Sequence, residues 1–231
     1  MNSLFFLSPL ILQKAIWHAT RAILFFFCRF EVCGLENLED IINLRSYLNH
    51  KGGVVFAANH SSEMDAIVVP AALPFFSPFL PIFYVSRPRE FYKTSGWRQI
   101  FYGGFIFRLW GSHPAIAGFK DYEKSLATHI NILEKGGSVL IFPEGRKTRD
   151  GNIGSEAHGG VAYLGHHTGC PVVPVRIFGD FNMTLSDFFL CRRRIVVVFG
   201  APIFLNENGQ ADYKKDAQDI LAAITVIHIH A

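Results

Sequence analysis

Short runs of consecutive apolar, mostly β-branched residues recur along the chain, and this pattern is typical of strands covered on both faces. The clearest runs are Val54–Ala58, Ile82–Val85, Ser138–Phe142, Val172–Ile177 and Ile195–Phe199, preceded by a shorter strand candidate at Arg29–Gly34. Helical candidates lie around them at Leu38–Leu48, Ser62–Ala72, Arg89–Phe107, Lys120–Lys135, Glu156–Thr168 and Asp212–Ile227. Because strands and helices alternate, the sequence predicts an α/β fold, a single layered domain with helices flanking a mostly parallel sheet.

The N-terminal segment follows a different pattern, which divides the chain into an attachment segment at residues 1–28 and a domain at residues 29–231. Ser8 and Pro9 suit a helix start, so a helix is predicted from Pro9 to about Phe27. Its polar side chains fall on one stripe, made of Lys14, His18 and Arg21. The apolar remainder predicts an amphipathic helix that lies in a membrane interface or dips into one leaflet. The alternative is a helix packed against the domain with its basic stripe in water.

The composition favours contact with an apolar environment. Hydrophobic residues make up 50% of the 231 residues and charged residues 18%, which lie above and below the ordinary soluble range respectively. Of the 23 phenylalanines, nine cluster in the two segments Leu4–Phe27 and Phe75–Tyr84. Prolines exclude a regular helix in the second segment, so it lines an acyl tunnel, touches a bilayer or forms covered core.

The net charge and the cysteine content limit the kinds of binding partner and the cellular compartment that we expect. A formal charge of +3 fits attraction to anionic lipid or to a phosphate-bearing substrate. The chain carries no basic and aromatic pattern of the known nucleic-acid modules, so nucleic acid is not an expected partner. Its four cysteines form no CxxC pair, which predicts free thiols in a reducing compartment, without disulfide, metal or cofactor. We therefore expect a peripheral or monotopic protein on the cytoplasmic face of a membrane.

A histidine follows the predicted strand Val54–Ala58, at the end of the strand where open α/β sheets bind ligands. His60 and Asp65 are five residues apart, so they diverge on a continuous helix and need a turn between them. If Ser62 caps the next helix, Asp65 takes the third helical position and its carboxylate can reach the imidazole. Such a pair suits general-base catalysis. The alternative is a capping box, in which Asp65 only accepts a backbone N–H.

A second polar loop follows the predicted strand Ser138–Phe142. It reads Phe142-Pro-Glu-Gly-Arg-Lys-Thr-Arg149, with a glycine that frees the turn and basic side chains suited to holding a phosphate. A solvated basic hairpin is the alternative. Because both loops follow buried strands at their carboxyl ends, we expect them to face one crevice.

Three segments in order, Asn59–Asp65, Phe142–Thr148 and Pro171–Val175, resemble blocks of the glycerolipid acyltransferases typified by 1-acylglycerol-3-phosphate acyltransferase. The family patterns are N-H-x-S-x-x-D, F-P-E-G-[TR]-R-[ST] and P-V-V-P-V, and the order and spacing match from roughly Arg29 to Ala201. The resemblance implies that His60 and Asp65 form the catalytic pair, with His60 as general base. It also implies residues that bind the acceptor or shape the acyl-donor pocket, namely Glu144, Gly145, Arg146 and Lys147 for the acceptor and Pro174 for the donor.

One block departs from the family pattern. Ala117 stands where the family has a phosphate-binding arginine, so Arg108 or His113 is the candidate substitute, or the acceptor's head group differs. The predicted reaction moves a fatty acyl group from acyl-CoA or acyl carrier protein to a lysolipid hydroxyl, best matched by 1-acylglycerol-3-phosphate, in phospholipid biosynthesis. The alternatives are another lysolipid acceptor, a thioesterase or lysophospholipase, and a non-catalytic lipid-binding relative. Ser61 and Ser62 are poor nucleophiles, because they adjoin His60 and no G-x-S-x-G elbow occurs.

Overall fold

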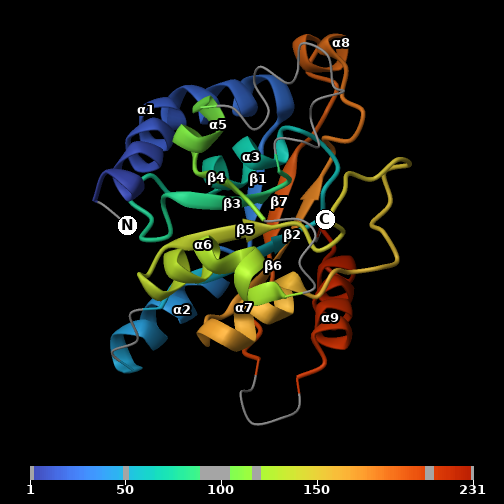
Figure 1. Cartoon of the computed structure of the whole chain (residues 1–231). Coiled ribbons are helices and arrows are strands. Elements are labelled where there is room, and N and C mark those ends of the chain that lie inside the picture. Colours follow the sequence, from blue (N-terminus) through green and yellow to red (C-terminus); the bar gives the residue numbers. More distant parts are fainter. Residues whose placement is uncertain (1–2, 49–51, 89–104, 116–120, 206–210, 230–231) are drawn as a thin grey trace.

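A seven-stranded sheet runs through the centre of the computed structural model, which describes residues 3–48, 52–88, 105–115, 121–205 and 211–229 (Figure 1). The strand order is β1-β7-β6-β2-β5-β3-β4. The strands are β1 (Glu31–Cys33), β2 (Val54–Ala58), β3 (Ile82–Ser86), β4 (Ser112–Pro114), β5 (Ser138–Ile141), β6 (Val172–Phe178) and β7 (Val196–Phe199). The block from β6 to β4 is parallel, whereas β7 runs antiparallel to β6 and carries β1 parallel to itself. The predicted α/β fold with a mostly parallel sheet is therefore confirmed.

Helices cover both faces of the sheet (Figure 1). They are α1 (Ser3–Cys28), α2 (Glu36–Leu48), α3 (Asp65–Ala72), α5 (Phe105–Trp110), α6 (Tyr122–Glu134), α7 (Gly160–Thr168), α8 (Leu185–Phe189) and α9 (Tyr213–Thr225). An apolar core lies on each face of the sheet. Successive side chains of β2 point into the two cores in turn, because side chains alternate along a strand. Phe56 joins the core under α1 and α3, and Val55 joins the core under α6, α7 and α9.

The structure adds elements that the sequence pattern did not predict. The edge strand β4 and the helix α8 are too short to produce a readable hydrophobic period. Most of the predicted helix Arg89–Phe107 lies outside the described residues, and α5 covers its last part. Residues 73–81 form turns, as the prolines predicted. Their side chains divide between core and solvent, since Phe79 is buried and Phe76 is exposed.

The N-terminal helix begins at Ser3, so the predicted start at Pro9 is wrong and the proline lies inside the helix. Tertiary packing extends the helix, because Phe5 stacks on Phe83 and on His113 ahead of the proline. Such packing contacts can keep residues helical where the local preference of the sequence would end the helix.

Polar side chains dock α1 onto the domain. Gln13 is buried, donates to the carbonyls of Ile82 and Trp110, and accepts the N–H of Ile82. Trp17 Nε1 and Arg21 donate to backbone carbonyls at the end of α3 and just after it. The helix therefore packs against the domain, as the alternative predicted. Of the predicted basic stripe, Arg21 contacts the domain, Lys14 is half-buried and His18 is exposed.

The opposite side of α1 presents apolar side chains to the outside. Phe25 and Phe26 are 64% and 69% exposed, and the other large hydrophobic side chains exposed on this helix are Leu7, Ile11, Ile16 and Ile23. The segment Phe5–Cys28 is long and apolar enough to cross a membrane, judged by length and composition. Helix α8 adjoins the C-terminal end of α1, where Phe27 stacks on Phe188, and it adds exposed Leu185, Phe189 and Leu190.

Candidate active site

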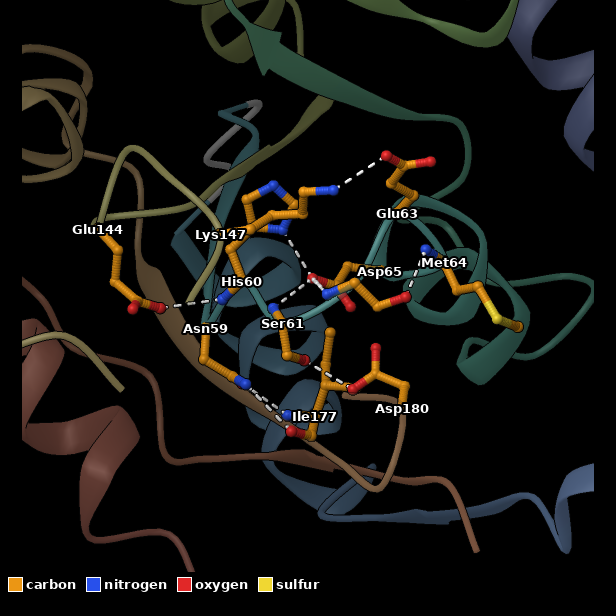
Figure 2. Close-up of polar contacts among 11 residues, drawn as sticks. Asn59, His60, Ser61, Glu63, Met64, Asp65, Glu144, Lys147, Ile177 and Asp180 are labelled. Atoms are coloured by element: carbon orange, nitrogen blue, oxygen red, sulfur yellow. Dashed lines mark hydrogen bonds and ion pairs between the residues drawn. The ribbon is translucent and has the colours of Figure 1, made fainter. Parts of the chain in front are cut away.

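The carboxyl ends of four neighbouring parallel strands gather the polar side chains of the site. His60 follows β2, Glu144 follows β5, Asp180 follows β6 and Arg87 follows β3. Figure 2 shows His60, Glu144 and Asp180 converging from these separate elements. The two loops that the sequence predicted to share one crevice are joined by hydrogen bonds described below.

His60 and Asp65 are in direct contact. The Nδ1 atom of His60 lies 2.7 Å from Oδ2 of Asp65, whose side chain is fully buried (Figure 2). The same Oδ2 accepts the backbone N–H groups of Ser61 and Ser62 at 2.9 and 3.1 Å. One oxygen atom of Asp65 therefore receives the imidazole as well as the backbone of the turn, so the carboxylate does more than accept backbone N–H groups, and the capping box of the alternative interpretation is not formed.

The turn between the two residues differs from the predicted one. Helix α3 begins at Asp65, with Met64 as its N-cap, so the expectation that Ser62 is the N-cap and Asp65 the third helical residue is wrong. Ser62 Oγ instead accepts the N–H of Met64 at 3.1 Å. The physical reason is that one carboxylate oxygen collects the N–H groups of Ser61 and Ser62, which folds these residues into a turn ahead of the helix.

The contacts of Asp65 define how His60 is oriented. Because an ionised carboxylate is only an acceptor, Nδ1 carries the hydrogen that faces Asp65 and the lone pair lies on Nε2. Nε2 points away from the carboxylate in Figure 2, and the His60 side chain keeps 22% of its surface exposed. A ring held in this tautomer with an accessible Nε2 has the arrangement of a general base.

Phe142 makes the surroundings of His60 apolar. The two rings stack with centroids 4.0 Å apart and an angle of 13° between their planes. Burial and, to a smaller extent, the charge of Lys147 lower the pKa of His60 to about 4, although the negative charge of Glu144 opposes the change. His60 is therefore neutral at physiological pH, as a general base must be before it accepts a proton.

Glu144 connects the loop 142–149 to the backbone of His60. Its Oε1 accepts the N–H of His60 at 2.9 Å, and its Oε2 accepts the N–H of Gly154 at 2.7 Å. On the other side, the carbonyl of His60 accepts the N–H of Thr148 at 2.8 Å. These contacts give Glu144 a positioning role, and its direct contact with an acceptor stays a prediction.

Gly145 occupies a position that requires glycine. Its φ is +63°, and a Cβ atom there would lie 2.6 Å from the His158 ring. Its carbonyl accepts two hydrogen bonds from the Arg87 guanidinium, at 3.2 Å from Nε and 2.6 Å from Nη2. Arg87 thereby stands at the rim of the site.

The remaining basic residues of the loop lie at the surface. Lys147 Nζ contacts Glu63 Oε1 at 2.9 Å, which joins this loop to the turn after His60 (Figure 2). Arg146 is exposed. With Arg87, we group these side chains as a basic rim, defined as Arg87, Arg146 and Lys147, of which Lys147 acts electrostatically on His60.

Other candidates lie apart from this group. Arg108 is exposed on α5, and no hydrogen bond or ion pair within the described part of the chain ties it to the His60 turn or to the loop 142–149. His113 is buried against Phe5, and burial lowers its pKa to about 4, so it is a neutral packing residue. Pro174 is buried inside the sheet, opposite Ala57 in the β2–β6 register. Ala117 lies outside the described residues.

Besides Asp180, sequence reasoning missed three contributors to the site. Asn59 extends the β2–β6 ladder through its side chain, donating to the carbonyl of Ile177 at 3.0 Å and accepting its N–H at 2.7 Å. The Phe142 ring and the Arg87 guanidinium are the others. Both stand at strand ends, and that position is the signal by which they could have been found. Ser61 Oγ points to Asp180, at 2.6 Å, which agrees with its exclusion as a nucleophile.

Fold and site together define the class of protein: an α/β domain that presents an imidazole, oriented by a buried carboxylate, at the carboxyl edge of its sheet. A model of the acyltransferase family matches residues 29–178, which is more than half of the sequence. The chain therefore belongs to the acyltransferase family.

Two curated plant proteins are similar to it. The 1-acyl-sn-glycerol-3-phosphate acyltransferase LPAT1, chloroplastic, of Arabidopsis thaliana is 34% identical over 180 residues, which cover 77% of this chain and 44% of the relative. The 1-acyl-sn-glycerol-3-phosphate acyltransferase BAT2, chloroplastic, of Brassica napus is 32% identical over 77 residues, 32% of this chain and 22% of the relative. The chain thus aligns with less than half of the length of either relative.

Proposed function

We propose that the protein transfers a fatty acyl group from a thioester donor to the hydroxyl of a lysolipid, with His60 as general base. The observation that carries the proposal is the 2.7 Å contact between His60 Nδ1 and the buried Asp65, which leaves Nε2 as the accessible basic atom. Family membership supports acyl transfer as the reaction class.

The proposed mechanism uses His60 without an acyl-enzyme intermediate. The acceptor hydroxyl donates a hydrogen bond to Nε2, which takes the proton as the oxygen attacks the thioester carbonyl. Asp65 stabilises the imidazolium that forms, the tetrahedral intermediate collapses, and the thiolate leaves with a proton returned from the imidazolium or from water. Positioning of the two substrates supplies the rest of the acceleration.

We propose 1-acylglycerol-3-phosphate as the acceptor that fits best. The basic rim (Arg87, Arg146 and Lys147) supplies charge next to the imidazole, and a guanidinium can bind a phosphate monoester with two hydrogen bonds. Both curated relatives carry this substrate in their names. The donor-side role of Pro174, acceptor binding by Glu144, Gly145 and Arg108, and the choice between acyl-CoA and acyl carrier protein stay predictions.

A panel of lysolipids that differ only in head group tests the acceptor. With a labelled thioester, we expect product only, or fastest, with the free phosphate monoester. Arg146→Ala should raise KM for that acceptor by about 10- to 100-fold, since a charge-assisted hydrogen bond contributes roughly 1.5–3 kcal/mol. Arg146→Lys, which keeps the charge, should lose less. Equal KM values for Arg146→Ala and the wild type would contradict phosphate binding by this residue.

The same assay separates transfer from hydrolysis. A thioesterase or lysophospholipase would use His60 to activate water and release free fatty acid without an acceptor. Free acid as the main product, at a rate independent of lysolipid, would replace the transferase proposal with a hydrolase. Absence of all thioester turnover would favour a non-catalytic lipid-binding protein.

The pH dependence of kcat/KM reports the burial of His60. Because only neutral His60 accepts a proton and burial lowers its pKa to about 4, activity should persist below the reference histidine pKa of about 6.5. Lys147→Ala removes a positive charge that lowers this pKa, so the acidic limb should move to higher pH. The control is Lys124→Ala, which removes a lysine paired with Asp121 on α6. If kcat/KM fell at the same acidic pH in Lys147→Ala and in the wild type, His60 would not be the group whose protonation limits activity.

We also propose that the protein lies on the cytoplasmic face of a membrane, through the exposed apolar sides of α1 and α8. The polar side of α1 is used for docking on the domain, which favours a helix lying in the interface over one that crosses. Arg29 and Arg192 are exposed next to this surface, where they suit anionic head groups.

Co-sedimentation with vesicles that contain anionic lipid tests this orientation. The double variant Phe25→Ser, Phe26→Ser should bind at least about tenfold more weakly, because each buried aromatic side chain contributes roughly 1.5–3 kcal/mol. Both side chains are exposed in the protein, so the fold should survive. Phe204→Ser, another exposed phenylalanine outside α1 and α8, should bind like the wild type. Unchanged binding of the double variant would contradict the proposal.

A further inference from the structure

Asp180 is a buried carboxyl next to the proposed catalytic pair. It follows β6 and the glycine at position 179, and its residue is only 1% exposed. Its Oδ1 accepts the hydroxyl of Ser61 at 2.6 Å (Figure 2). It stands just beyond residues 29–178, the span that the family model matches, so nothing in the family match assigns it a role.

The other oxygen of Asp180 faces Asp65. Oδ2 of Asp180 and Oδ1 of Asp65 are both buried, and neither has a donor among the described residues. Figure 2 shows the two carboxyl groups turned toward each other, and a hydrogen bond between them contributes to the pKa of both. Two buried carboxylate oxygens cannot face each other without a donor unless a proton lies between them.

We propose that Asp180 is a positioning residue that shares one proton with Asp65, between Asp180 Oδ2 and Asp65 Oδ1. The pair then carries one proton and one negative charge. With Oδ1 of Asp65 satisfied by this proton, Oδ2 stays turned toward His60 Nδ1 and the N–H groups of the turn. This inference deepens the proposed function, because it concerns the group that orients the general base.

The electrostatic surroundings agree with a protonated Asp180. Burial, followed by the hydrogen bond and the charge of Asp65, raises the pKa of Asp180 to about 8. The groups that face Asp180 are the Asp65 carboxyl and the Ser61 hydroxyl, with His60 beyond Asp65. Three other charged side chains, those of Lys147, Glu144 and Glu63, act on His60. Lys147 also acts on Asp65.

Substitution of Asp180 by asparagine and by alanine tests whether the shared proton, and not only the volume of the side chain, positions Asp65. In Asp180→Asn the amide N–H can donate to Asp65 Oδ1 while the amide oxygen accepts from Ser61, so the variant imitates the neutral acid. We expect kcat near that of the wild type. Asp180→Ala removes the donor, and kcat should fall by about 10- to 100-fold with little change in KM, as when an outer partner that orients a reactive group is lost. An Asp180→Asn variant as slow as Asp180→Ala would overturn the shared proton.

The pH dependence of the Tm tests, without any substrate, whether Asp180 and Asp65 share a proton. If Asp180 keeps its proton in the folded protein and releases it on unfolding, the wild type loses stability as pH rises from about 4, the ordinary aspartate pKa, to about 8. Asp180→Asn has no such proton, so its Tm relative to the wild type should increase over this range and level off above it. A Tm difference that does not change with pH would overturn the proposal.

The two measurements distinguish failure of this inference from failure of the proposed function. The stability experiment reads the carboxyl pair alone, so it keeps its meaning if the protein transfers no acyl group. The kinetic experiment keeps its meaning for any thioester turnover that depends on His60. If Asp180→Ala unfolds, the pH-dependent Tm of Asp180→Asn still decides the question.

Discussion

His60→Ala should reduce acyl transfer by about 10²–10⁴-fold in kcat while the protein stays folded, since general-base help commonly has this size. The imidazole is the only part of the proposed mechanism that takes the acceptor's proton, and its Nε2 atom is the accessible one. Steady-state turnover of a labelled thioester with a lysolipid measures the loss. Circular dichroism spectra that match the wild type show that the variant is folded.

The chain offers a matched control for this variant. His166 Nε2 lies 2.7 Å from Asp216 Oδ2, the same separation as in the His60–Asp65 pair. This second pair joins α7 and α9, on the other face of the sheet from α3. His166→Ala should keep wild-type turnover. Near-normal turnover in His60→Ala would remove His60 from the mechanism.

Asp65→Asn should lower kcat by a comparable factor, about 10²–10⁴-fold, although asparagine retains the shape of the side chain. The amide oxygen can still accept the N–H groups of Ser61 and Ser62, but it carries no charge to stabilise the imidazolium. The measurement is kcat at saturating donor and acceptor. Asp216→Asn, the same change in the second histidine–aspartate pair, should leave kcat unchanged.

This variant also separates the two roles that one oxygen of Asp65 plays. If Asp65 served only the backbone at the start of α3, asparagine would replace it well, because asparagine and aspartate serve helix starts about equally. Turnover near the wild-type value in Asp65→Asn would therefore leave Asp65 with a structural role alone. A large loss, with Tm close to that of the wild type, would identify the negative charge as the part that matters.

The fold could be predicted because its signals are local. Continuous apolar runs marked five of the seven strands closely, and the position of His60 just after β2 marked it as a candidate. The edge strand β4 could not be predicted, since three residues carry no period. The start of α1 was misplaced for the opposite reason. Pro9 is a strong local signal, and the packing of Phe5 on Phe83 overrides it.

The site could be predicted only in part. Resemblance indicated His60 and Asp65, and the structure brings them together. Asp180 is 119 positions from Ser61, and its role depends on a strand crossover that no spacing rule describes. Glu144 lay within a predicted motif, yet its contacts with backbone N–H groups of His60 and Gly154 could not be read from the motif. Residue types indicated the chemistry, and the topology determined which atoms meet.

The docking of α1 through Gln13 means that attachment and folding depend on the same helix. The side-chain amide completes the hydrogen bonding of Ile82 at the start of β3 and of Trp110 at the end of α5, while Leu24 and Cys28 fill the core on that side. Shortening the chain to gain solubility would remove these hydrogen bonds and expose the apolar core under α1. Detergent that covers the outer side of α1 leaves those inner contacts in place, so it is the gentler route to a soluble, folded protein.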